Sequence, residues 1–252
     1  MPADRLDQVL VQRGLCASRE KARRAIMAGQ VRINNHPARK PSDRVLPSDS
    51  IKLEAPEKYV SRGGYKLEHA LRTFQLDVTG LCAVDLGAST GGFTDCLLQH
   101  GAACVYAIDV GTGQLAWKLR QDSRVVVMEG VNARLLTPCA MPPGFSSADL
   151  VVVDCSFISL TKILPVAVAL LKSSGNIVAL VKPQFEAGRR ESAKGKGVIR
   201  DPAIHDRVLR ELENFVRNQK MLSWLSTTES PLLGPAGNKE FFALIEKTGK
   251  SD

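Results

Sequence analysis

From Leu81 onward, short apolar runs alternate with helix-length segments, and this rhythm constrains the fold more than any other feature of the chain. The apolar runs are nearly continuous, as strands that are buried on both faces of a sheet require. We therefore predict an α/β fold with a mostly parallel seven-stranded sheet that helices cover on both faces. Strands are expected at residues 81–86, 104–108, 124–128, 150–153, 176–181, 222–226 and 241–246, and helices near 65–74, 94–100, 114–120, 160–172 and 202–218.

The first part of the chain has a different pattern, which predicts a small α+β domain. Leu6, Val9 and Leu10 have the spacing of a short amphipathic helix. Asn34 and Asn35 separate two short β-prone runs and can supply the positive φ angles of a tight hairpin. We expect a small domain over 1–56, a linker over 57–63 and a larger domain over 64–252, with a second short helix at 19–28 and short strands at 31–33, 36–39 and 49–53.

Positive charge is concentrated in this small domain. The whole chain has 34 Lys and Arg against 26 Asp and Glu, a formal net charge of +8. Residues 1–60 hold 12 basic and 7 acidic residues, or +5, so a quarter of the chain carries most of the excess. A basic surface gains binding free energy when it releases counterions from phosphates, which favours a nucleic acid as partner.

Other features exclude several classes of protein. The six cysteines form no Cys-x-x-Cys pair, so we expect reduced thiols rather than disulfides or a metal site. The longest apolar run, 163–171, has nine residues and contains Pro165, which is too short to span a bilayer. The N-terminus lacks the apolar core of a signal peptide. We therefore expect a cytoplasmic protein that has no membrane partner.

A glycine-rich turn, from Gly87 to Gly92, follows the first predicted strand of the larger domain. Glycines there let the backbone turn sharply and let a ligand approach closely. Their spacing is Gly-x-x-x-Gly-Gly, which differs from the dinucleotide pattern Gly-x-Gly-x-x-Gly and from a phosphate loop ending in Gly-Lys-Ser/Thr. The turn therefore favours neither NAD nor ATP, and a purely structural turn remains an alternative.

Acidic residues end the first two strands of the larger domain. Asp109 follows Asp85 by 24 residues and is placed to accept hydrogen bonds from ribose hydroxyls. Asp85 can meet a cationic group, although either carboxylate alone could also be a cap or a surface residue. S-adenosylmethionine has an ammonium and a ribose but no phosphate, so it fits this pattern. The glycine turn and the two acids predict a cofactor site that includes Asp85, Gly87, Gly91, Gly92 and Asp109.

Two more charged residues, Asp154 and Lys182, end apolar strands, and in open α/β sheets ligands bind at that edge. Methylation of a ribose 2′-hydroxyl requires a base, and a lysine can serve when a neighbouring cation or desolvation lowers its pKa. Lys66 and Glu240 are further candidates. Their spacing in the sequence does not bring them to the sheet edge, so a surface role stays open for both.

The small domain resembles the RNA-binding module first described in ribosomal small-subunit protein four. The similarity rests on Arg5-Leu6-Asp7, Arg13-Gly14-Leu15, Ser18-Arg19, Gly29-Gln30-Val31 and Lys40-Pro41. Asn35 replaces the usual hairpin glycine, which is tolerable because Asn accepts the left-handed conformation. The resemblance implies an RNA partner, and the basic residues expected to contact it are Arg5, Arg13, Arg19, Arg23, Arg24 and Lys40.

The larger domain resembles the FtsJ-type 2′-O-methyltransferases, which have a Rossmann-like fold. The matching motifs are Ser61-Arg62-Gly63-Gly64, the turn from Asp85 to Asp95, Asp109-Val110-Gly111, Asn132-Ala133-Arg134, the segment from Asp154 to Leu160, the segment from Val181 to Glu186, and Gly237-Asn238-Lys239-Glu240. Together with the small domain, they resemble the TlyA, or haemolysin A-like, rRNA methyltransferases. This resemblance implies S-adenosylmethionine as cofactor, a cytidine ribose in rRNA as substrate, and rRNA or a ribosomal subunit as partner. It also adds Ser89, Phe93, Val110 and Asn132 to the predicted cofactor-binding residues.

The family's Lys-Asp-Lys-Glu tetrad falls on Lys66, Asp154, Lys182 and Glu240. By that resemblance Lys182 is the general base, Lys66 favours its neutral form and helps to position the 2′-oxygen, and the two acids orient the lysines. Three alternatives remain: a non-catalytic RNA-binding protein, a membrane-active haemolysin, and a pseudouridine synthase, in which the glycine turn after a parallel strand is not expected. The sequence predicts a mobile basic loop over 187–200 and leaves the oligomeric state open.

Overall fold

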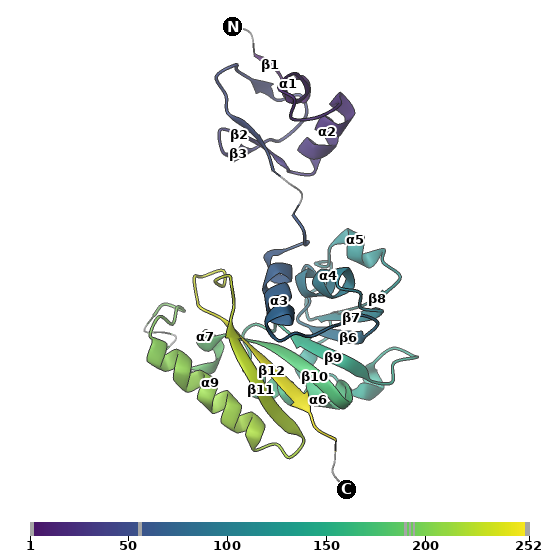
Figure 1. Ribbon diagram of the computed structural model, residues 1–252, viewed down its shortest axis with the longest axis vertical. Helices are drawn as coiled ribbons and strands as arrows, with labels where there is room; N and C mark the ends of the chain where they lie inside the picture. Colours follow the sequence, from purple (N-terminus) through teal and green to yellow (C-terminus); the bar gives the residue numbers. More distant parts are fainter. Residues whose placement is uncertain (1–2, 55–56, 189–190, 192, 194, 250–252) are drawn as a thin grey trace. The chain divides into compact units, whose positions relative to one another are not determined.

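The computed structural model describes residues 3–54, 57–188, 191, 193 and 195–249 (Figure 1). The chain divides into two compact units, residues 1–58 and 59–252. Each unit has its own apolar core and is described by itself. In the described part of the chain, no helix has both the length and the apolar character needed to cross a membrane.

The N-terminal unit packs two helices against short strands. Helices α1 (Leu6–Gln12) and α2 (Arg19–Met27) confirm the predicted amphipathic segments, and Leu6 and Leu10 are completely buried. The predicted hairpin turn is also confirmed, since Asn34 and Asn35 have φ angles of 49° and 69°. Strands β2 (Val31–Ile33), β3 (His36–Pro37) and β5 (Ile51–Leu53) form an antiparallel sheet in the order β3-β2-β5, and a pair that was not predicted joins β1 (Asp4–Arg5) to β4 (Arg44–Val45).

The larger unit contains a seven-stranded sheet in the order β11-β12-β10-β9-β6-β7-β8 (Figure 1). The strands from β10 to β8 are parallel, whereas β12 is antiparallel to both of its neighbours. This arrangement confirms the predicted fold class. The strands are β6 (Cys82–Leu86), β7 (Cys104–Asp109), β8 (Val125–Glu129), β9 (Ala148–Val153), β10 (Leu171–Val181), β11 (Leu222–Glu229) and β12 (Phe241–Lys247).

Helices cover both faces of this sheet because successive strand residues point to opposite sides. Along β9, Val151 and Val153 join one apolar cluster, whereas Leu150 and Val152 join the other. Helices α6 (Leu160–Leu170) and α9 (Pro202–Arg217) pack in the first cluster, and α3 (Arg62–Thr73), α4 (Gly92–Gln99) and α5 (Trp117–Arg120) pack in the second. Two single-turn 3-10 helices, η1 (Ala133–Leu135) and η2 (Pro138–Ala140), and the short α7 (Pro183–Glu186) complete the unit.

Several element boundaries differ from the prediction. The helix expected at 114–120 begins only at Trp117. Helix α6 ends at Leu170, and the chain enters β10 at the next residue. Arg62 and Gly63, which the sequence assigned to a linker, lie in α3. The basic loop predicted over 187–200 falls partly outside the described residues, since 189, 190, 192 and 194 are not among them.

Candidate functional site

Two adjoining cavities open near the carboxyl ends of β6, β7 and β9, and three residues line both of them: Gly87, Ser89 and Asp154. The first cavity, of about 390 Å³, is called the Lys66 cavity here and is also lined by Ser61, Arg62, Gly63, Lys66, Gly92, Phe93 and Pro235. The second, of about 480 Å³, is called the Asp109 cavity and is also lined by Ile108, Asp109, Val110, Asn132, Phe157 and Ile158. The sheet edge predicted from the sequence therefore carries a two-part cleft.

The glycine turn between these cavities passes close to the end of β9. Gly87 has a φ of 89°, and a Cβ atom there would lie 2.9 Å from the carbonyl carbon and oxygen of Asp154. Gly91, with a φ of 95°, is the N-cap of α4. Glycine is needed at Gly87 for both conformation and close approach, so the turn can form the shared wall of the two cavities.

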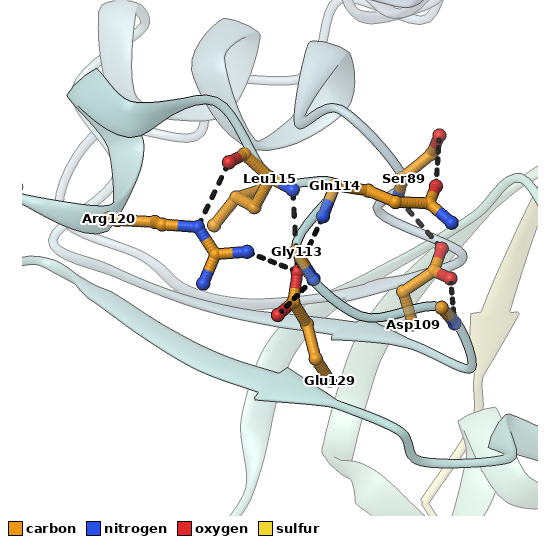
Figure 2. A network of polar contacts seen from close by, with 8 residues as sticks. Ser89, Asp109, Gly113, Gln114, Leu115, Arg120 and Glu129 are labelled. Carbon is orange, nitrogen blue, oxygen red and sulfur yellow. Dashed lines mark hydrogen bonds and ion pairs between the residues drawn. The ribbon is translucent and has the colours of Figure 1, made fainter.

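Asp109 connects the glycine turn to the loop that follows β7 (Figure 2). Its Oδ2 accepts a hydrogen bond from the backbone amide of Ser89 at 2.8 Å, and its Oδ1 accepts one from Gly111 at 2.7 Å. The carboxylate lies in the wall of the Asp109 cavity beside Val110, whose side chain is exposed. This position suits an acceptor for the hydroxyls of a bound ribose.

Glu129, which the sequence analysis did not single out, fixes the same loop from the end of β8 (Figure 2). Its carboxylate accepts hydrogen bonds from the amides of Gly113 at 2.9 Å and Gln114 at 3.1 Å, and it forms an ion pair with Arg120. These bonds, led by the one from Gly113, lower the pKa of Glu129 to about 2. Because the amides of Gly113 and Gln114 donate to Glu129, the helix predicted from residue 114 begins only at Trp117. The sequence signal that could have identified Glu129 is its position as an acidic residue at the end of β8, like Asp109 at the end of β7.

Asp85 lies at the carboxyl end of β6, as predicted, and its side chain turns to α4. Its side chain is completely buried and lines neither cavity. Its Oδ2 accepts hydrogen bonds from Thr94 N at 3.0 Å and Thr94 Oγ1 at 2.7 Å, so it holds the first turn of α4. Burial raises the pKa of Asp85 to about 7. Its Oδ1 has no hydrogen-bond partner among the described residues, so the contact of Asp85 with a cofactor ammonium stays a prediction beside its role at the start of α4.

Two lysine–carboxylate pairs border the cleft. Lys66 Nζ on α3 lies 2.6 Å from Glu240 Oε2, just before β12, and both side chains are buried. Lys182 Nζ at the end of β10 lies 2.6 Å from Asp154 Oδ1 and donates a hydrogen bond to Ser156 Oγ at 2.9 Å. Lys66 and Asp154 line the same cavity, so the structure brings the four predicted residues together beside the glycine turn. Ser156 is an additional contact that the sequence did not identify.

Phe157 is a second residue that the sequence analysis left without a role. Its side chain is 89% exposed although it lines the Asp109 cavity, and its φ of 64° places it in the left-handed region. Its ring centroid lies 5.0 Å from that of Phe185. An exposed aromatic ring in a strained backbone conformation beside a cavity is typical of a functional position.

The basic residues predicted in the N-terminal unit differ in what they contact. Arg5 and Arg19 both bond to the buried carboxylate of Asp7, at 3.0 Å and 2.9 Å. Arg13 donates hydrogen bonds to backbone carbonyl oxygens of the 46–49 turn. Arg24 pairs with Glu20 one helical turn away, and Arg23 and Lys40 are exposed. Arg13 thus supports the fold of the unit, while α2 presents several cations to solvent.

The cysteines form no disulfide among the described residues. All six cysteines are free thiols, ranging from the buried Cys96 to the exposed Cys139. Among the described residues, no three His, Cys, Asp or Glu side chains gather in a way that would hold a metal ion.

Comparison with known proteins agrees with this architecture. Residues 59–247 match the FtsJ-like methyltransferase family, and residues 4–51 match the S4 domain. The 16S/23S rRNA (cytidine-2′-O)-methyltransferase TlyA of Mycobacterium tuberculosis is 47% identical over 242 residues, which cover 94% of this chain and 88% of that protein.

Solved structures have the same fold. A candidate haemolysin from Streptococcus thermophilus superposes with a TM-score of 0.73 at 45% identity and covers 98% of this chain and 90% of its own. The O-methyltransferase TomG of Streptomyces achromogenes, solved with S-adenosylmethionine, has a TM-score of 0.52 at 17% identity and covers 77% of this chain and 83% of its own, which supports the fold alone. This chain therefore belongs to the FtsJ-like methyltransferase family, in the TlyA group whose members combine that domain with an S4 domain.

Proposed function

We propose that this protein transfers a methyl group from S-adenosylmethionine to a ribose 2′-hydroxyl of rRNA, with a cytidine as the target nucleotide. The observation that carries the proposal is the position of two lysine–carboxylate pairs at the cleft, since Asp154 lies in the wall that the two cavities share and Lys66 lines one of them. One cavity can hold the methyl donor and the other can admit the acceptor. The name of the 47% identical relative from Mycobacterium tuberculosis supports the choice of cytidine and rRNA.

The donor set of the Asp109 cavity fits S-adenosylmethionine. Asp109 can accept hydrogen bonds from the ribose, and the apolar side chains of Val110 and Ile158 can flank the adenine ring. The first turn of α4, which begins at Gly92 in the adjoining wall, offers partial positive charge to the methionine carboxylate. The cofactor would supply an electrophilic methyl group. Gly87 and Gly91 would shape this wall, because a Cβ at Gly87 would meet the backbone of Asp154 and one at Gly91 would meet the side chain of Leu119.

The residues around the acceptor would handle the proton and the alignment. In its neutral form, Lys182 can take the proton from the 2′-hydroxyl as that oxygen becomes the nucleophile. Asp154 and Ser156 hold the Lys182 side chain in place. Lys66, held by Glu240, can donate a hydrogen bond to the oxygen and stabilise its growing negative charge. In-line displacement depends mainly on this alignment, so the rigidity of both pairs matters.

The N-terminal unit would bind the rRNA. It carries most of the charge excess of the chain, and Arg23 and Lys40 are exposed for contact with phosphates. A protein that modifies rRNA or a ribosomal subunit would act in the cytoplasm. The six basic residues predicted to bind RNA, which include Arg5 and Arg13, remain part of this proposal.

The direct test is to map methyl groups on rRNA. Cells that lack the protein would be complemented with the wild-type chain or with Lys182→Ala, and ribose methylation would be read along both ribosomal subunits. We expect at least one cytidine to be 2′-O-methylated only with the wild-type chain. An rRNA that carries the same methyl groups in all strains would contradict the proposal and favour a non-catalytic RNA-binding protein.

The haemolysin alternative is tested separately, since one structural relative bears that name. Purified protein would be added to dye-loaded phospholipid vesicles at micromolar concentration. We expect no release of dye above that caused by a heat-denatured control. Rapid leakage that depends on the folded protein would support a membrane activity in addition to methyl transfer.

A further inference from the structure

Beyond their strands, the segments that carry Asp154 and Lys182 remain in contact with each other. The first contact is the ion pair between these two residues. The second is between the rings of Phe157 and Phe185, whose centroids are 5.0 Å apart. The third, farther along both segments, is made by Glu186. The loop 154–160 and the segment 182–186 are thus connected at three successive levels.

Glu186 makes the third contact with both of its carboxylate oxygens. Its Oε2 accepts a hydrogen bond from Ser159 Oγ at 2.6 Å, and its Oε1 accepts one from the amide of Leu160 at 2.8 Å. Ser159 is the N-cap of α6 and Leu160 is its first residue. A carboxylate is stabilised at a helix N-terminus, where backbone amides lack partners within the helix. Glu186 therefore fixes the point at which the loop 154–160 enters α6.

The fixed entry point matters because the loop between the two anchors has a strained conformation. Phe157 has a φ of 64°. Its ring is largely exposed, so packing in an apolar core does not stabilise this conformation. A non-glycine residue keeps such a conformation only when its surroundings enforce it. The anchor at one end is the contact of Lys182 with Asp154 and Ser156, and the anchor at the other end is Glu186.

The environment of Glu186 indicates that hydrogen bonds hold it. Burial raises its pKa, while the bonds from Ser159 and Leu160 act in the opposite direction. A partly buried carboxylate that accepts hydrogen bonds from two groups at the start of one helix has a defined geometric role. It does not line either cavity of the cleft. We therefore expect its effect on methyl transfer to pass through the two segments that its bonds connect, the loop 154–160 and the segment 182–186.

We propose that Glu186 is a positioning residue for methyl transfer, which fixes the loop 154–160 so that Asp154 and Ser156 keep Lys182 aligned. This inference rests on the proposed function. It differs from the roles of the four tetrad residues, because Glu186 acts on the start of α6, five to six residues beyond Asp154. Its side chain does not touch the groups that would react.

The test compares Glu186→Ala with Glu186→Gln in the full-length chain. Single-turnover methyl transfer to rRNA, the Kd for S-adenosylmethionine and the melting temperature would be measured for each. We expect Glu186→Ala to slow transfer about 10- to 100-fold, while the cofactor Kd changes by less than about threefold. Glutamine keeps an acceptor for the Leu160 amide and can donate to Ser159 Oγ, so we expect it to restore most of the rate. Glu213→Ala, which removes an exposed ion pair with Arg217 on α9, is the matched control.

Each outcome decides between distinct possibilities. A wild-type rate for Glu186→Ala would overturn the positioning role, as would equal losses of rate, cofactor affinity and melting temperature in both variants. If the alanine variant does not fold, Ser159→Ala replaces it. That variant removes one of the two bonds, and we expect a smaller loss of rate with cofactor affinity retained; an unchanged rate would again overturn the proposal. A wild-type protein that methylates no rRNA would instead refute the proposed function.

Discussion

Each unit of the molecule contains a completely buried aspartate, and the two have opposite acid–base properties. Asp7 in the N-terminal unit accepts hydrogen bonds from Arg5 and Arg19, and the bond from Arg5 makes the largest contribution to lowering its pKa. Asp85 in the larger unit bonds only to Thr94 among the described residues, and burial raises its pKa to about 7. Neither side chain is exposed to solvent. The bonds from the two arginines outweigh the cost of burial at Asp7, whereas burial outweighs the bonds from Thr94 at Asp85.

The position of the cations also differs between the units. Arg5 and Arg19, which pair with Asp7, have side chains that are 36% and 53% exposed. Asp7 therefore holds two cations at the surface of the N-terminal unit. Lys66 and Lys182 are only 8% and 10% exposed and border a cleft. These two arginines thus face outward, as binding to a polyanion would require, whereas Lys66 and Lys182 face the cleft, as the proposed catalysis would require. The predictions below test this division.

The largest effect is expected from Lys182→Ala. Loss of the proposed base should lower kcat about 10²- to 10⁴-fold, while the affinities for S-adenosylmethionine and RNA change little. Single-turnover transfer and equilibrium binding would be measured on the same preparations. Lys172→Ala is the control, because Lys172 pairs with Asp149 near the start of β10. A variant that transfers methyl groups at the wild-type rate would remove the base assignment, and a matched loss of RNA affinity would break the division between the units.

Asp7→Asn should have the largest effect on the N-terminal unit. Asparagine leaves Arg5 and Arg19 without their charge-assisted bonds, at a cost of about 1–3 kcal/mol in the unfolding free energy of that unit. The unit contains no Trp, Tyr or Phe, so amide hydrogen exchange across residues 3–54 is the suitable measurement. We expect faster exchange there and weaker RNA binding, with an unchanged kcat at saturating RNA. Exchange that equals the wild type would show that the arginines do not depend on Asp7.

Asp85→Asn should change how stability depends on pH in the other unit. Because the folded pKa of Asp85 is raised to about 7, the folded state holds a proton that the unfolded state has already released above pH 4. The unfolding free energy therefore falls as pH rises from about 4 to 7, by up to about 1.4 kcal/mol per pH unit. Asparagine keeps an acceptor for Thr94 and should remove this slope. Both tryptophans, Trp117 and Trp224, lie in this unit, so their fluorescence reports its unfolding. Parallel pH profiles for the two proteins would contradict the shift.

Asp85, the pair of Lys66 and Glu240, and Glu129 show what the sequence could and could not predict. Apolar runs and glycine turns predicted where the strands lie along the chain, because each buried strand is itself a short run of apolar residues. The sequence also indicated that Asp85 ends a strand, but not that its carboxylate turns to Thr94 on α4. Lys66 and Glu240 are 174 residues apart, so only the antiparallel insertion of β12 beside β10 brings them together. Glu129 shortened a predicted helix through contacts that no periodicity records.

The smallest effect is expected from removing exposed charges on the N-terminal unit, and it sharpens the comparison most directly. Arg23 and Lys40 are exposed, whereas Arg5 and Arg19 are partly committed to Asp7. If both exposed residues contact phosphates, Arg23→Gln with Lys40→Gln should weaken RNA binding several-fold at low salt. The slope of log K against log salt should fall by about 1 for each residue.

The control for this pair is Arg217→Gln, which removes a cation of the larger unit that is paired with Glu213. It should leave the salt slope unchanged, since a surface ion pair on α9 is not expected to release counterions from RNA. A double variant that keeps the wild-type slope would mean that these two cations do not contact phosphates. A control that lowers the slope as much would mean that outward charge in the larger unit also binds RNA, and the division between an RNA-binding unit and a catalytic unit would then be incomplete.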